Sequence, residues 1–307
     1  MPPKESPLEE TKTITHAPEA RLGMAGLIAA YFGVALTNIF ASRFLAVGPE
    51  WFSQAATPED VVRRVVLPEA FAGTLALAIV LRLGWRRGCG FVVPPLRPGL
   101  LVGLLPVCLL VVAGVGIAFR AFPSAQAGFV PTLLLGQFMV GFNEETASRG
   151  ILLYGLERLR SRRFALMLSS VLFGVTHLVG LAFGWSLGES LNRVLLATIL
   201  GLMLGVVRLR TGSIWFPIAI HGLWNFIVLG ALTIPKSELG PLAALPVLAV
   251  FSVPVIAGLL RLSEHPRGRR PELVGTRGAR PDLLRPDISY RGPWPVAGRR
   301  GPTVPPA

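Results

Sequence analysis

The sequence contains few charged residues and almost no lysine. Charged residues make up 15% of the 307 residues, and only 3 of the 30 basic residues are lysines. An ordinary soluble domain is about one quarter charged. With 52% hydrophobic residues and a mean hydropathy of +0.59, this shortage of charge excludes a typical soluble globular protein. We expect an all-α, polytopic membrane helix bundle.

Cysteine is also scarce, which excludes a disulfide framework. Cys89 lies in a basic loop and Cys108 in an apolar run, and they lack the paired spacing of a disulfide or a cysteine-rich zinc site. The net charge of +13 does not indicate nucleic-acid binding, because nine arginines fall in the last 45 positions. We expect no nucleic-acid partner. The tail 263–307 is rich in Pro and Arg and is expected to be disordered, with a possible affinity for anionic lipid.

Long hydrophobic runs dominate the rest of the chain. Eight runs are long enough to cross about 30 Å of hydrocarbon, at residues 22–42, 65–83, 99–119, 129–156, 164–184, 191–207, 214–233 and 242–262. Residues 22–262 are therefore predicted to form one eight-span transmembrane domain, with a motif-bearing core at 129–233. The polar segment 1–21 lacks the pattern of a cleaved signal peptide.

The basic residues of the short loops predict the orientation of the chain. If the N-terminus is inside, ten arginines fall in inner loops: Arg82, Arg86, Arg87, Arg97, Arg158, Arg160, Arg162, Arg163, Arg208 and Arg210. Six basic residues then fall in outer loops: Arg43, Arg63, Arg64, Arg120, Arg193 and Lys236. Because Lys and Arg accumulate on the cytoplasmic face, both termini are predicted to be cytoplasmic. Heavy use of Arg, Ala, Gly and Pro is typical of a GC-rich bacterial genome, which suggests the plasma membrane of a bacterium.

The fourth run carries three charges near its middle, at Glu144, Glu145 and Arg149. Uncompensated charges at the bilayer centre would cost about 8 to 10 kcal/mol for the three. Residues four apart share a helix face, so Glu145 can pair with Arg149, whereas Glu144 points about 100° away. Glu145 is thus expected to be structural and Glu144 available for chemistry. The alternative is an ion pair that only sets the helix register.

Two later runs also contain polar residues in their interior. His177 lies in the fifth run, and His221 and Asn225 share one face of the seventh. Singly, each is typical of a residue that hydrogen-bonds one helix to another. Together with Glu144, they supply what amide hydrolysis requires: a base for water, groups that hold it, and donors for an oxyanion. We expect them to meet in one cytoplasm-facing cavity.

Three motifs in this part of the chain resemble those of a known family. The sequences EETASR (144–149), FGVTH (173–177) and HGLWN (221–225) are similar to the EExxxR, FxxxH and HxxxN motifs of the CPBP family. That family comprises CAAX prenyl proteases of type II and bacteriocin-processing intramembrane proteases, and is also called Abi. The resemblance implies that Glu144 activates water with His177, and that Glu145 and Arg149 hold the geometry. His221 and Asn225 would bind water or stabilise the oxyanion.

The sequence leaves open whether a metal takes part, which substrate is cleaved and whether the protein is an enzyme at all. The family is commonly named a metalloprotease, and Glu144, His177 and His221 could bind one zinc ion with an open position; a metal-free mechanism fits the same residues. The expected partners are the lipid bilayer and a membrane-associated protein or peptide substrate. A non-catalytic scaffold, a bacteriocin-immunity protein or a transporter could use the same polar network.

Overall fold

The computed structural model describes residues 21–45, 57–93, 101–122 and 126–235. Chain contacts divide the protein into two units, Met1–His265 and Pro266–Ala307, and every described residue lies in the first. Within these ranges all regular structure is helical. The prediction of an all-α polytopic protein is therefore confirmed, while the predicted tail and the eighth span, 242–262, lie outside the described residues.

Several helices follow one another without a break. The elements are α1 (Met24–Leu45), α2 (Pro58–Val61), η1 (Val62–Val66), α3 (Leu67–Arg82), α4 (Leu101–Ala121), α5 (Phe129–Glu145), η3 (Thr146–Leu153), α6 (Tyr154–Leu159), α7 (Arg162–Thr176), η4 (His177–Phe183), α8 (Leu187–Thr211) and α9 (Trp215–Thr233). Of these, η1 and η3 are π-helical and η4 is a 3₁₀ helix. Thus α5, η3 and α6 form one uninterrupted rod.

Among the residues that the structure describes, six helices are long and apolar enough to cross a membrane, so the chain is a multi-pass membrane protein. They are Met24–Phe44, Pro58–Arg82, Val102–Ala121, Arg162–Phe183, Leu187–Thr211 and Trp215–Thr233. The predicted fourth span is helical throughout, but the charges of Glu144, Glu145 and Arg149 keep it out of this apolar set. The count of eight spans stays a prediction.

Two helices begin earlier than the hydrophobic runs indicated. The second begins at Pro58 rather than at 65, where Thr57 caps it by accepting a hydrogen bond from the Asp60 amide. The sixth begins at Leu187 rather than at 191, with Ser186 and Glu189 forming the same kind of capping box. A polar first turn satisfies free backbone amides, so hydropathy alone misses it.

Some arginines assigned to loops lie within helices. Arg63 and Arg64 lie in η1, and Arg193 and Arg208 lie in α8. Arg208 is 8% exposed and donates hydrogen bonds to the carbonyls of Gly88 and Cys89. Its buried guanidinium ties the end of α8 to the segment after α3. It therefore serves packing, and its assignment to an inner loop was wrong.

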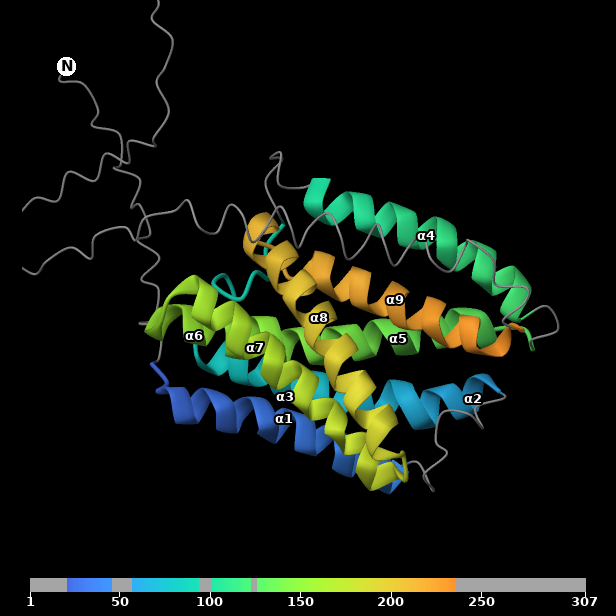
Figure 1. Cartoon of the computed structure of the whole chain (residues 1–307), viewed down its shortest axis with the longest axis horizontal. Helices are drawn as coiled ribbons and strands as arrows, with labels where there is room; N and C mark the ends of the chain where they lie inside the picture. The colour runs from blue at the N-terminus through green and yellow to red at the C-terminus, as the bar shows by residue number, and fades with distance from the viewer. Residues whose placement is uncertain (1–20, 46–56, 94–100, 123–125, 236–307) are drawn as a thin grey trace, which may run out of the picture. The chain divides into compact units, whose positions relative to one another are not determined.

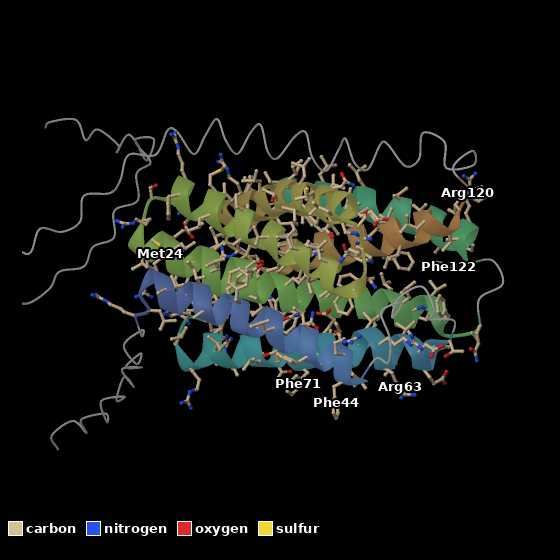
Figure 2. The ribbon with its side chains drawn as sticks, turned by 60° about the horizontal axis from the view of Figure 1, so that its bottom comes forward. Met24, Phe44, Arg63, Phe71, Arg120 and Phe122 are labelled. Atoms are coloured by element: carbon tan, nitrogen blue, oxygen red, sulfur yellow. The ribbon has the colours of Figure 1, made fainter. Side chains whose placement is uncertain are left out.

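The rod of α5 is enclosed by its neighbours. It packs against α9 and α3, while α1 packs on α3, α7 on α8 and α4 on α9. Figure 1 shows α5 between α9 and α3. On the outside of the helices, Phe44 of α1 and Phe71 of α3 project outward (Figure 2) and are 89% and 62% exposed. Such an apolar exterior matches lipid tails, and the polar residues of α5 face inward.

Candidate active site

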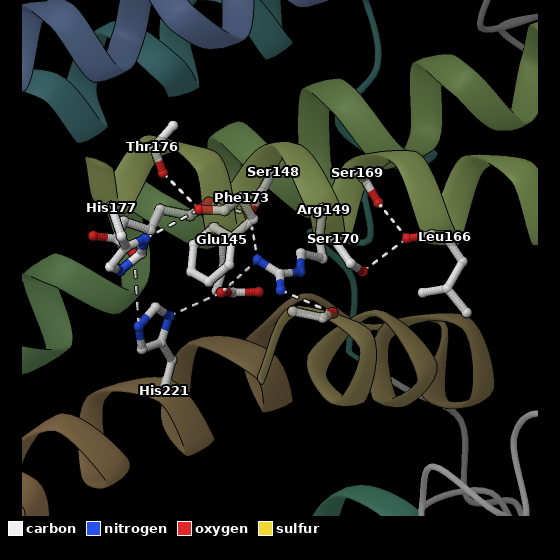
Figure 3. A network of polar contacts seen from close by, with 12 residues as sticks. Glu145, Ser148, Arg149, Leu166, Ser169, Ser170, Phe173, Thr176, His177 and His221 are labelled. Carbon is white, nitrogen blue, oxygen red and sulfur yellow. Dashed lines mark hydrogen bonds and ion pairs between the residues drawn. The ribbon is translucent and has the colours of Figure 1, made fainter. Parts of the chain in front are cut away.

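The predicted pair of Glu145 and Arg149 is present at the end of α5. Arg149 Nη1 lies 3.0 Å from Glu145 Oε1, and the two side chains are 2% and 0% exposed. Figure 3 shows Glu145 between Arg149 and His221. The i, i+4 spacing on a nearly continuous helix produces this contact, so the predicted ion pair is confirmed.

Arg149 is further fixed by groups from three other positions. Its guanidinium donates to the hydroxyl of Ser148 and to the carbonyl of Gly201, the latter at 3.0 Å. The ring of Phe173 lies 4.5 Å from the guanidinium carbon. A buried charge is stable only when paired and hydrogen-bonded. Arg149 thus joins the end of α5 to α7 and α8.

His221 bridges the two neighbouring glutamates. Its Nδ1–H donates to Glu145 Oε1 at 2.8 Å, which directs Nε2 toward Glu144 Oε2 at 3.7 Å. The second distance exceeds a hydrogen bond, and Glu144 Oε2 has no other partner among the described residues. The Glu144 side chain is 27% exposed, whereas that of Glu145 is fully buried. The Glu144 side chain is thus more exposed than that of Glu145, although its Oε2 atom is itself buried, and the predicted division of roles between the two carboxylates stays a prediction.

Small residues permit the approach of α9 to α5. A Cβ atom on Gly141 would lie 2.7 Å from the carbonyl oxygen of Ile218, and one on Gly222 would lie 3.1 Å from the backbone of Gln137 and Phe138. Both glycines face backbone of the opposite helix, where side chains cannot move aside. This close contact brings His221, next to Gly222 in sequence, within bonding distance of Glu145.

His177 ends α7 and begins η4. Its Nδ1–H donates to the Phe173 carbonyl at 3.1 Å, which leaves Nε2 as the free ring nitrogen. The Phe173 ring contacts both histidines, with centroid distances of 5.3 Å to His177 and 5.8 Å to His221. Glu144 is within electrostatic range of both histidines. Phe173 thus supports the two imidazoles on either side of the carboxylate.

Asn225 is the one predicted site residue for which the described part of the chain shows no side-chain hydrogen bond or ion pair. It lies on α9 one turn beyond His221 and is half-buried. Its amide has no hydrogen-bond partner in the part of the chain that the structure describes. The structure therefore gathers Glu144, Glu145, Arg149, His177 and His221, and leaves the Asn225 side chain free to bind water or substrate.

The geometry does not assemble a metal-binding set. Among the described residues, no group of three or more His, Cys, Asp or Glu side chains is placed to hold a metal ion. His221 directs one nitrogen to Glu145, and His177 directs one to a backbone carbonyl. These bonds engage only Nδ1 of each ring and leave both Nε2 atoms available beside Glu144, so the zinc alternative stays a prediction.

A pocket of about 220 Å³ lies elsewhere, at the start of α8. It is lined by Trp185, Glu189, Asn192 and Arg193. It includes none of the six predicted site residues. The cytoplasm-facing cavity that we expected at the motif residues stays a prediction, and access to the site rests on the partly exposed side chain of Glu144.

A π-helix directly follows the two glutamates, and no pattern in the sequence predicted it. All eight residues of η3, Thr146–Leu153, are buried. Cys89 donates a hydrogen bond from Sγ to the carbonyl of Gly150 in this segment, at 3.1 Å. π-helical turns are rare and are frequent at functional sites. Here the π-helix carries Arg149 back toward the carboxylate it pairs with.

Three polar residues beside the site were also missed. Glu69 of α3 accepts hydrogen bonds from Asn38 of α1 and from Asn143 of α5. All three lie inside predicted membrane runs, and a glutamate within such a run is itself a signal of function. Glu69 is within electrostatic range of Glu144 and His221. It therefore belongs to the surroundings of the site.

Comparison with known proteins finds one matching family. Residues 126–227 match the family model described as type II CAAX prenyl endopeptidase Rce1-like. The match runs from just before α5 into α9 and contains Glu144, Glu145, Arg149, His177, His221 and Asn225. No curated protein sequence matches the chain significantly. The segment 126–227, about a third of the chain, carries all three motifs and is similar to this family of CAAX-type proteases.

Proposed function

We propose that the chain is an intramembrane endopeptidase that hydrolyses a peptide bond of a membrane-associated protein or peptide. The observation that carries this proposal is the contrast between the neighbouring glutamates. Glu145 is fully buried against Arg149 and His221, whereas Glu144 is partly exposed and faces His221 Nε2 at 3.7 Å without a hydrogen bond. A carboxylate held in this way is suited to bind and deprotonate water.

The proposed reaction assigns each side chain one role. Glu144, assisted by the free Nε2 of His177, takes a proton from water as the water oxygen attacks the carbonyl carbon of the substrate. Negative charge then develops on the carbonyl oxygen. The Asn225 amide donates to this oxyanion, and His221 donates to it through Nε2–H when its ring is doubly protonated. When the C–N bond breaks, Glu144 returns the proton to the leaving amine, so the products are a carboxylate and an amine.

The remaining residues hold this geometry. Glu145 accepts the Nδ1–H of His221 and thereby selects the ring tautomer and orientation, as a carboxylate does in a catalytic triad. Arg149 neutralises Glu145 and anchors it to the carbonyl of Gly201. No step of this reaction is routed through zinc.

The substrate class follows from the family and from the site's position within membrane-crossing helices. The matching family model is described by its action on CAAX prenyl substrates, and for this chain we propose only a membrane-associated protein or peptide. We also propose that the protein lies in a bacterial plasma membrane with both termini in the cytoplasm. Nine of the ten arginines assigned to inner loops support this orientation. The tenth, Arg208, is buried and is left out of the count.

Cleavage of natural membrane proteins tests the proposal. The purified protein is incubated in detergent micelles with a mixture of solubilised bacterial membrane proteins, and newly formed C-termini are identified by mass spectrometry. The wild type is expected to produce new termini, and Glu144→Ala none. The control Glu59→Gln, at an exposed residue of α2, should behave as the wild type. Equal sets of termini from wild type and Glu144→Ala would instead favour a scaffold, immunity protein or transporter.

A further inference from the structure

Glu69 is a buried acid that the proposed reaction does not use. It lies in α3, within the candidate span Pro58–Arg82, and is 6% exposed. Within the described ranges, no Lys or Arg forms an ion pair with it. An ionisable side chain inside a membrane is costly and is a functional residue by default. Its contacts show which function it serves.

Both carboxylate oxygens of Glu69 accept hydrogen bonds from amides on other helices. Asn38 Nδ2 of α1 donates to Oε1 at 3.0 Å, and Asn143 Nδ2 of α5 donates to Oε2 at 2.8 Å. The carbonyl oxygens of both asparagines are buried and have no partner among the described residues. Glu69 is therefore the group that determines which way the two amides point.

Asn143 begins the turn of α5 that carries the reacting carboxylate. Three successive side chains, Asn143, Glu144 and Glu145, leave the helix about 100° apart. Asn143 bonds to α3, Glu144 faces His221 of α9, and Glu145 bonds to Arg149 and His221. A rotation of this turn about the helix axis would move all three. The Glu69 contact opposes such a rotation from the side away from α9.

This turn needs an external support because the helix changes its hydrogen bonding there. The α-helix ends at Glu145 and the π-helix begins at Thr146, so the backbone pattern alone does not define one rotation. The packing of α3 also closes on this turn. A Cβ atom on Gly73, one turn beyond Glu69, would lie 2.9 Å from the Phe142 ring. The hydrogen bond and the close packing hold the same turn from the same helix.

We propose that Glu69 is a positioning residue of the active site. Through Asn143 it holds the last turn of α5 in the rotation that directs Glu144 toward His221. This inference rests on the peptide hydrolysis proposed above. A displacement of about 1 Å at a reacting group can lower a rate by about 100-fold, so a lost contact one residue away from Glu144 acts on turnover.

Substitutions at Glu69 and Asn143 separate positioning from simple stability. In Glu69→Gln, one carboxylate oxygen is replaced by an NH₂ group, which can pair with Asn38 or Asn143 only if that asparagine amide turns around to present its oxygen. In Glu69→Asp the acid is one methylene shorter, and in Asn143→Gln the amide is one methylene longer. The double variant Glu69→Asp with Asn143→Gln restores the combined length. Glu59→Gln is the matched exposed control.

The measurements are kcat, KM and the unfolding midpoint in detergent, with the peptide cleaved fastest in the membrane-protein experiment as substrate. We expect Glu69→Gln, Glu69→Asp and Asn143→Gln to lower kcat by about 10- to 100-fold with little change in KM. The double variant should recover kcat to within about threefold of wild type, since the two residues act as one pair. If a single variant fails to fold, the kcat of the double variant still tests the positioning role.

The outcomes distinguish this inference from the proposed function. An unchanged kcat in Glu69→Gln, or a double variant as slow as the slower single one, overturns the positioning role and leaves the proposed peptidase intact. A fall in kcat that only follows a fall in the unfolding midpoint also overturns it. If the wild type and Glu144→Ala cleave equally, the proposed function fails, and the positioning role fails with it.

Discussion

At the scale of single residues, two adjacent glutamates differ because a helix turns about 100° between them. Glu145 meets Arg149 and His221 inside the bundle, whereas Glu144 retains 27% exposure. Their chemical identity is the same, so their surroundings alone assign the roles. Glu145 should therefore be needed for folding, and Glu144 for the reaction.

This difference predicts opposite results for Arg149→Met and Glu144→Gln. Removing Arg149 leaves Glu145 buried without its cationic partner, which typically costs about 3 to 5 kcal/mol. Replacing Glu144 by its isosteric amide should change stability by less than about 1 kcal/mol while abolishing cleavage. Unfolding midpoints in mixed micelles, measured beside cleavage rates, test both. A stable Arg149→Met protein, or an active Glu144→Gln protein, would contradict the assignment.

The sequence predicts some of these residues well and others poorly. The contact of Glu145 with Arg149 follows from a spacing of four along one helix. The contact of Glu69 with Asn143 joins residues 74 apart, and no local spacing encodes it. Tertiary packing also turned His221 toward Glu145, a hydrogen-bond partner that the motif alone did not reveal.

At the scale of helices, the site depends on how closely α9 approaches α5. Gly141 and Gly222 lie at this contact, each against backbone of the other helix. Small residues allow close packing of helices in membranes. The closeness is functional here, because it sets the distance from His221 to both glutamates.

An added methyl group should therefore separate these two helices. Gly141→Ala places a Cβ atom 2.7 Å from the Ile218 carbonyl oxygen and is expected to cost about 1 to 3 kcal/mol and to lower cleavage. In the control Gly116→Ala on α4, no atom lies within 4 Å of the new Cβ, and helix propensity favours alanine over glycine. Unfolding midpoints and cleavage rates should fall only in Gly141→Ala. Similar behaviour of the two variants would refute the proposed contact.

Hydrophobic runs predicted the existence of the described helices better than their ends. The caps at Thr57 and Ser186 extend two helices into polar sequence. The π-helix η3 was unpredictable from propensity, because it depends on the contacts of Arg149 and Gly150 with α8 and with Cys89. The hydrophobic pattern therefore located the helices. Their ends and the π-helix beside the site depend on capping and on tertiary packing.

At the scale of the whole molecule, the long helix formed by α5, η3 and α6 can be used to determine the orientation of the protein in the membrane. The helix from α5 through α6 runs without interruption from Phe129 to Leu159, and at 1.5 Å per residue it is longer than the roughly 30 Å hydrocarbon core. Residues near its two ends, such as Gln126 and Arg160, should therefore lie on opposite sides. The predicted topology puts Arg160 in the cytoplasm.

Cysteine labelling tests this orientation. In a Cys108→Ser background, Gln126→Cys should react with a membrane-impermeable thiol reagent in intact cells, and Arg160→Cys only after lysis. Both positions are exposed, so differences in reactivity report the side of the membrane. The reverse pattern would show that the outer and inner loops were assigned to the wrong faces.

The central claim is that Glu144 deprotonates the water molecule whose oxygen attacks the peptide carbonyl. Hydrolysis of a cleaved peptide in water enriched in oxygen-18 measures this directly, by the mass of the new C-terminal product. We predict that each wild-type product carries one oxygen-18 atom in its new carboxylate, and that Glu144→Gln forms no labelled product. Labelled product from Glu144→Gln at the wild-type rate, or cleavage by the wild type without incorporation of the label, would contradict the claim.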